Sequence, residues 1–78
     1  MLDTARSDMS GGPGLLDVVA LIRDLPSHGL QSGQVGTVVE NLKTGVFEVE
    51  FSDDDGRTYA LVALAAEHLL VLHYEPVH

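Results

Sequence analysis

Residues 46–52, VFEVEFS, alternate between apolar and acidic side chains at their centre. Successive side chains of a β-strand point to opposite faces of the sheet, so the apolar residues are expected to share one face and Glu48 and Glu50 the other. Such a strand buries its apolar face and leaves its acidic face in water. The residues expected in the core are Phe47, Val49 and Phe51. Any fold of this chain must therefore place a core on one side of a sheet and solvent on the other.

Four other segments have the length and composition of short strands: residues 17–23, 35–41, 57–64 and 69–73. The first also has apolar residues at helical spacing, but its Val and Ile content and the following Pro26 favour a strand. Gly36 indicates a bulge or a close backbone approach. Residues 25–34 predict a long loop, and residues 65–68 a single 3₁₀ turn. This order predicts an all-β fold, a small five-stranded SH3-like barrel with a 3₁₀ turn before the last strand.

A chain of 78 residues is long enough for one small domain. We predict a disordered N-terminal tail over residues 1–14, because this segment is polar and rich in glycine. The barrel domain is predicted over residues 15–76, followed by a frayed C-terminus at residues 77–78. Met9 is an alternative to Met1 as the native start.

The first hairpin has two possible registers. A three-residue turn places Glu40 opposite Glu48, where two carboxylates repel each other across the strand pair. A four-residue turn, residues 42–45, instead pairs Val38 with Val49. We therefore expect the four-residue turn.

The second hairpin turns at residues 53–56, where aspartates occupy the early turn positions and the final glycine supplies a positive φ. A three-residue loop there pairs Asp53 with Arg57 and Val49 with Leu61. The strand that follows is apolar on both of its faces, so this register decides which face is buried. The side chains expected inside are Tyr59 and Leu61, and those expected outside are Val62 and Leu64.

Charge and composition exclude several classes of function. The net charge is −8, from 12 acidic and 4 basic residues, so neither nucleic acid nor an anionic membrane is an expected partner. An acidic domain suits a basic protein partner, or gains solubility. There is no cysteine, and no apolar run resembles a signal peptide or spans a bilayer. We expect a soluble cytoplasmic protein.

Three stretches of the chain carry a family resemblance: DVVALIRDLPSHGLQSGQVGTVVE, VFEVEFSDDDGRTYAL and AEHLLVL. Together they resemble a family of short stand-alone bacterial proteins classed as a domain of unknown function, over roughly residues 16–76. Residues 32–39 also resemble the entry strand of KOW-type and other SH3-like barrels. The resemblance implies the barrel fold and supplies no catalytic residues.

The same resemblance implies a role only in outline. Members of the family occur in bacterial accessory gene neighbourhoods, some of them beside small toxin-like genes, which implies a partner-binding, antitoxin-like or immunity-like protein. The KOW likeness implies contact with RNA or the ribosome, and the acidic balance of this chain argues against that contact.

Two groups of residues are candidates for binding a partner. The first is the expected outer face, where Val62 and Leu64 lie beside Glu48 and Glu50, an apolar centre with a charged rim. The second is the long loop, because loops of this length often carry function. Its candidate residues are His28 and Gln31.

Catalytic, cofactor and metal sites are not predicted. Ser27 lies beside His28 without a third group to orient the pair, and a chain of this length has little room for a ligand pocket. The four histidines do not have the spacing of zinc ligands, and Asp53–Asp55 are typical of a solvated turn. Glu67 and His68 are the first candidates if a metal were bound. The histidines are His28, His68, His73 and His78.

We therefore predict a non-enzymatic protein-interaction module that binds a protein partner, either basic or a second copy of itself as a homodimer. An acidic nucleic-acid mimic that inhibits a basic protein is the first alternative. It predicts that Glu40, Glu48, Glu50 and Asp53–Asp55 form one stripe. A KOW-like domain that binds RNA or the ribosome is the second, and it requires exposed aromatic side chains or a positive patch.

Overall fold

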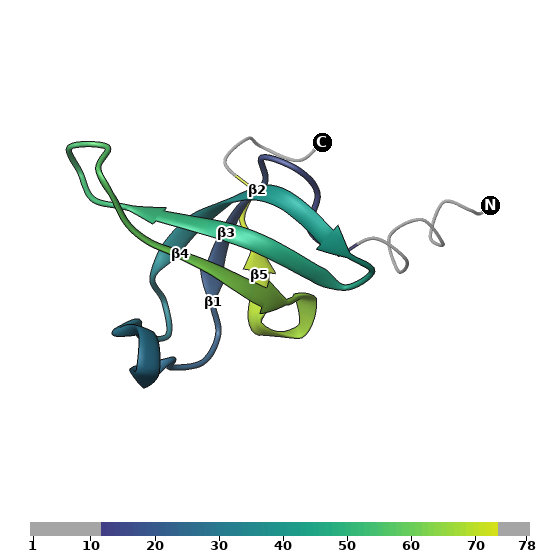
Figure 1. Ribbon diagram of the computed structural model, residues 1–78, viewed down its shortest axis with the longest axis horizontal. Coiled ribbons are helices and arrows are strands. Elements are labelled where there is room, and N and C mark those ends of the chain that lie inside the picture. The colour runs from purple at the N-terminus through teal and green to yellow at the C-terminus, as the bar shows by residue number, and fades with distance from the viewer. Residues whose placement is uncertain (1–11, 74–78) are drawn as a thin grey trace.

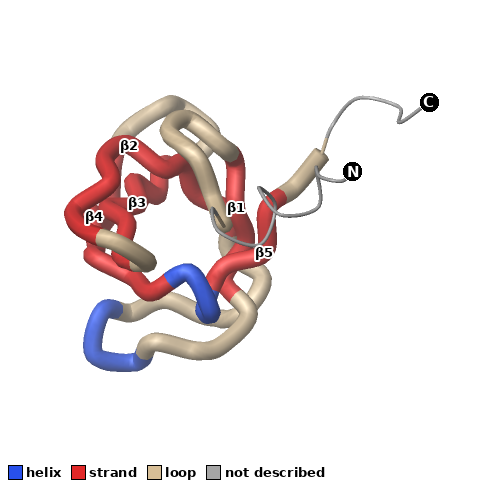
Figure 2. Tube along the Cα trace, turned by 90° about the vertical axis from the view of Figure 1, so that its right-hand side faces the viewer, coloured by secondary structure: helices blue, strands red, loops and turns tan. Residues whose placement is uncertain are grey.

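A computed structural model describes residues 12–73, which form five strands in one antiparallel sheet. The strand order is β4-β3-β2-β1-β5, and the sheet curls around a central core (Figures 1 and 2). This arrangement confirms the predicted all-β, SH3-like barrel with a 3₁₀ turn before the last strand. The elements in chain order are β1 (Val18–Leu21), η1 (Pro26–His28), β2 (Val35–Lys43), β3 (Val46–Ser52), β4 (Thr58–Ala65), η2 (Ala66–His68) and β5 (Leu69–Val71).

The strand boundaries follow the sequence pattern to within two residues. Strand β1 is shorter than predicted at both ends, β4 is shifted by one residue, and β5 ends two residues early, at Val71. Strand β3 has the predicted limits, and β1 is a strand instead of the helix that its apolar spacing also allows. Strand β2 continues two residues further than expected, to Lys43. The predicted loop contains the short helix η1, which begins at Pro26 and ends where Gly29 adopts a left-handed φ of 70°.

The ordered chain begins before residue 15. Pro13 is buried, and the backbone N–H of Gly14 donates to the Asp17 carboxylate at 2.7 Å. The N–H of Leu16 donates to the carbonyl of Val38, also at 2.7 Å, which ties this segment to β2. Pro13 and Gly14, which the sequence places in the predicted tail, are thus part of the folded chain. Residues 1–11, with both candidate start sites, and residues 74–78 lie outside the described part of the chain.

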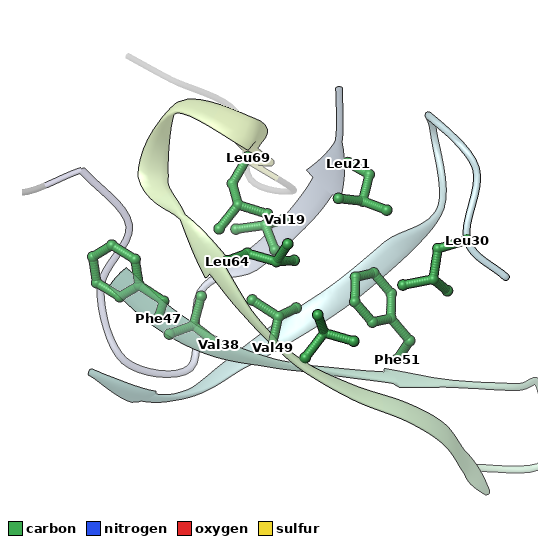
Figure 3. Close-up of a cluster of buried hydrophobic side chains, with 10 residues drawn as sticks. Val19, Leu21, Leu30, Val38, Phe47, Val49, Phe51, Leu64 and Leu69 are labelled. Carbon is green, nitrogen blue, oxygen red and sulfur yellow. The ribbon is translucent and has the colours of Figure 1, made fainter. Parts of the chain in front are cut away.

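One hydrophobic cluster fills the barrel (Figure 3). Phe47, Val49 and Phe51 all lie in it, as the alternation in β3 predicts. Gly36 makes room for this packing, because a Cβ atom there would lie 2.8 Å from the Glu50 carbonyl oxygen and 2.9 Å from the Phe51 ring. The close backbone approach expected at Gly36 is thus confirmed. The full cluster is Val19, Leu21, Leu30, Val38, Phe47, Val49, Phe51, Val62, Leu64 and Leu69.

The predicted orientation of β4 is wrong. The turn itself is as expected, because the N–H of Asp53 donates to the carbonyl of Arg57 at 2.9 Å. A register shift follows between the Phe51 and Ser52 pairs, however, and it places Val62 instead of Leu61 opposite Val49. A slip of one residue turns every following side chain to the other face of the sheet.

As a result, Val62 and Leu64 are only 6% and 5% exposed, whereas Leu61 is 55% exposed. The two residues proposed as an outer contact surface are part of the core. Tyr59, which the sequence also placed inside, is 50% exposed, although its ring centroid lies 6.5 Å from that of Phe51.

The first hairpin contains both pairings that the sequence sets against each other. Val38 pairs with Val49 as expected, and Glu40 also lies opposite Glu48. A bulge between these pairs adds Val39 to β2 as an extra residue. This shift of one residue allows both pairings to occur in the same hairpin. The turn then contains only two residues outside the strands, so the predicted four-residue turn is wrong.

Candidate protein-interaction surface

The outer side of strands β2, β3 and β4 carries a surface that we call the acidic face. It consists of Glu40, Glu48, Glu50, Leu61 and Ala63. Glu48 lies between two cross-strand neighbours, Glu40 on β2 and Ala63 on β4. Glu50, two residues along β3, lies between Thr37 and Leu61. Alternation in β3 points both glutamates away from the core, so they lie beside each other in the middle of this face.

Among the described residues, no cationic side chain forms an ion pair with this face. Within residues 12–73, Arg57 pairs with Asp55, and Glu67 lies 3.6 Å from the His68 ring; both contacts lie outside the acidic face. The Glu50 carboxylate accepts a hydrogen bond from the Thr58 hydroxyl on β4. Like charges directly opposite each other in a sheet are destabilising, so a cation placed over the Glu40 and Glu48 carboxylates would relieve their repulsion.

Part of the predicted acidic stripe has a structural task in the β3–β4 turn. The Asp53 carboxylate accepts hydrogen bonds from the backbone N–H groups of Asp55 and Arg57, both at 2.9 Å. Gly56 completes the turn with a φ of 82°. The aspartates therefore stabilise a turn, and Asp55 also pairs with Arg57 at 3.7 Å. The carboxylates of the acidic face are therefore those of its three glutamates.

The loop candidates do not belong to the acidic face. His28 and Gln31 are exposed in the loop between β1 and β2, whereas Glu40 follows five residues into β2. The loop is fixed to the barrel by Gln34, whose side-chain amide donates to the Tyr59 hydroxyl at 3.0 Å. The structure thus brings together Glu48 and Glu50 of the predicted partner-binding residues and places His28 and Gln31 elsewhere.

The histidines within the described range lie apart from one another. His68 accepts a hydrogen bond at Nε2 from the Arg23 guanidinium at 3.0 Å, and His28 contacts the Ser27 hydroxyl at 3.3 Å. Over residues 12–73 there is no group of three His, Asp or Glu side chains that could hold a metal ion. His78 lies outside the described residues. The same range contains no helix with the length and apolar character needed to cross a membrane.

A second exposed surface lies on the outer side of β1 and its two neighbours. Ala20 on β1 pairs with Val35 on β2 and Leu70 on β5, and the last two are exposed. Ile22 continues the same face beyond the end of β1 and is also exposed. We call these four residues the apolar face.

Sequence reasoning missed Leu61 and Ala63 because β4 is apolar on both sides. In residues 58–65, TYALVALA, the sequence pattern allows either Leu61 on one face or Val62 and Leu64 on the other face to be buried. A bulge decides between the two faces, and no glycine marks its position in the sequence. The sequence pattern disfavours the opposition of Glu40 and Glu48, because two carboxylates there repel each other. That repulsion was itself the signal of a surface on which charge is not compensated within the described chain.

A family model described as Domain of unknown function (DUF4926) matches residues 15–71. No curated protein and no solved structure gives a significant match.

Proposed function

Since the chain belongs to the family described as Domain of unknown function (DUF4926), which assigns it no activity, we propose from its own surface that it is a non-enzymatic module that binds a basic protein partner. The observation that carries the proposal is the direct opposition of Glu40 and Glu48 on an exposed sheet face. Exposed Leu61 lies on the same face, so apolar contact and charge are available together.

The net charge of the chain also favours a basic protein as the partner. The whole chain has a net charge of −8, which attracts a cationic partner during diffusion and repels nucleic acid. The features that would support RNA binding are weak among the described residues. Both phenylalanines are buried, which leaves the Tyr59 ring as the exposed aromatic group of the described residues. Arg23, Lys43 and Arg57 lie on three separate segments.

An antitoxin-like or immunity-like role is the biological form that we favour for this binding. A protein that neutralises its partner by covering a basic functional surface needs a surface of opposite charge, and the acidic face suits that task. If the covered surface of the partner is one that binds DNA or RNA, this chain acts as a nucleic-acid mimic. Competition by duplex DNA or RNA for the captured partner distinguishes mimicry from binding elsewhere on that partner.

The test is affinity capture from the native host with three forms of the chain. They are the wild type, Glu40→Gln/Glu48→Gln, and a control, Asp54→Asn/Glu67→Gln, that removes the same charge outside the acidic face. We expect a basic protein to be retained by the wild type and the control. Its affinity for the first variant should fall about tenfold, from roughly 0.7 kcal/mol for each of the two carboxylates. Equal binding by all three forms would remove the proposal.

Self-association is a second candidate function, favoured by the apolar face. Three of its residues are exposed: Val35 on β2, Leu70 on β5, and Ile22 directly after β1. Contiguous apolar surface of this kind often marks a contact site. Sedimentation of the wild type and of Leu70→Lys tests it. A dimer that dissociates in the variant supports self-association, whereas a monomeric wild type at high micromolar concentration excludes it.

A further inference from the structure

Strand β4 is an edge of the sheet, and its outer side does not pair with any other strand of the described residues. The sheet ends at β4, which pairs with β3 alone among the described elements. Its eight residues, Thr58–Ala65, contain no charged residue and no proline. Charges, prolines and short lengths are the usual means by which edge strands avoid pairing with other chains. Strand β4 is not short and has neither charges nor proline, although a bulge lies near its start.

The hydrogen bonds at both ends of the β3–β4 pair show which backbone groups face outward. The N–H of Asp53 donates to Arg57, and at the other end the N–H of Ala66 donates to Gly45 at 2.9 Å. Residues that exchange hydrogen bonds alternate along an antiparallel pair with residues that do not. When this alternation is followed from either end of the pair, and the bulge is taken into account, Leu61 and Ala63 are residues that do not form hydrogen bonds with β3. Their N–H and C=O groups therefore point away from β3. Between residues 12 and 73, backbone hydrogen bonds outside the strand pairings do not reach either residue.

We infer that β4 accepts an extended, lysine- or arginine-rich segment of the partner as a sixth strand. This inference rests on the proposed function and specifies how the partner is held. The added strand would form hydrogen bonds with Leu61 and Ala63, the mode known as β-augmentation. Its alternate side chains would lie on the outer side of the sheet, next to the acidic face.

The geometry of the acidic face suits basic side chains at those positions. Ala63 is the only residue between the added strand and Glu48. Strands lie about 4.8 Å apart, so an added residue opposite Ala63 would be roughly 10 Å from Glu48, within reach of a lysine or arginine. The small side chain of Ala63 leaves this path open, and Glu40 lies just beyond Glu48. Backbone pairing therefore supplies the position, and the glutamates select the charge.

The probe is a nine-residue peptide that alternates lysine with valine, acetylated and amidated at its ends. Amide hydrogen exchange of the wild-type protein is followed by NMR. Without peptide, we expect the amides of Leu61 and Ala63 to exchange at least tenfold faster than those of Val62 and Leu64. With peptide, exchange at Leu61 and Ala63 should slow at least tenfold. A peptide with glutamate in place of lysine, and one with N-methylated backbone on its pairing edge, should both leave it unchanged.

A proline substitution tests the edge from the protein side. Ala63→Pro removes an N–H that β3 does not use, and proline is tolerated on the open side of edge strands. It should weaken lysine-peptide binding at least tenfold. Retained binding by Ala63→Pro, or unchanged exchange at Leu61 and Ala63, would overturn strand addition.

Comparison with Glu40→Gln/Glu48→Gln separates the two claims. If this variant binds the lysine peptide weakly while Ala63→Pro binds normally, charge recognition stands and strand addition fails. If exchange slows at Leu61 and Ala63 but the glutamate variant binds as tightly as the wild type, strand addition stands and the acidic face is not the selective element.

Discussion

Truncating one leucine on each face of β4 tests the orientation on which the acidic face depends. Leu64→Ala removes a side chain that is buried in the core, and Leu61→Ala removes one that is mostly exposed. A buried leucine truncated to alanine costs about 2–5 kcal/mol, which includes the cavity it leaves. The exposed substitution should change stability by about 0.5 kcal/mol or less. Both variants remove the same atoms from the same strand, so each controls for the other.

The size of this difference is large compared with the stability of the domain. A domain of about sixty ordered residues has a free energy of unfolding of roughly 3–9 kcal/mol, so Leu64→Ala should remove a large part of it. With an m-value near 1 kcal/mol/M in urea, the midpoint should fall by about 2 M or more, whereas Leu61→Ala should stay within about 0.5 M of the wild type. Equal losses, or a larger loss for Leu61→Ala, would refute the observed register.

Three further substitutions test local features of the barrel. Gly36→Ala should destabilise the protein by about 1–3 kcal/mol in the same urea assay, because its Cβ atom collides with backbone and with Phe51; an unchanged midpoint would contradict the close approach. Gly56→Ala should cost about 1 kcal/mol, since its φ of 82° is unfavourable for alanine; an increase in stability would show that the turn relaxes. Glu40→Lys should stabilise by about 0.5–1 kcal/mol more than Glu67→Lys, by replacing repulsion with attraction across the strand pair; equal effects would indicate that Glu40 and Glu48 do not interact.

The sequence was sufficient for the parts of the fold that rest on strict alternation. In β3 the acidic residues can lie on only one side, so its limits and its buried face follow from the pattern alone. Strand β1 followed from its Val and Ile content and from Pro26. The 3₁₀ turn before β5 followed from the shortness of residues 65–68.

The sequence was insufficient where one residue more or less decides the outcome. A bulge beside Tyr59 and another at Val39 each change a register, and neither includes a glycine or a proline. In β4 both faces are apolar, so the pattern cannot indicate which one is buried. The acidic face was therefore predicted with the correct glutamates and the wrong apolar partners, because the glutamates depend on β3 and the apolar residues depend on the bulge.

The ionic-strength dependence of partner binding tests the central claim most directly. The affinity of the captured basic protein is measured by calorimetry from 50 mM to 1 M NaCl, for the wild type and for Glu40→Gln/Glu48→Gln. Screening lengths fall to about 3 Å at 1 M salt, so exposed charge pairs are largely lost there. We predict that wild-type affinity falls steeply with salt and that the variant is weaker at low salt and converges with the wild type at high salt. Parallel salt dependences, with the two proteins equally tight throughout, would contradict recognition by the acidic face.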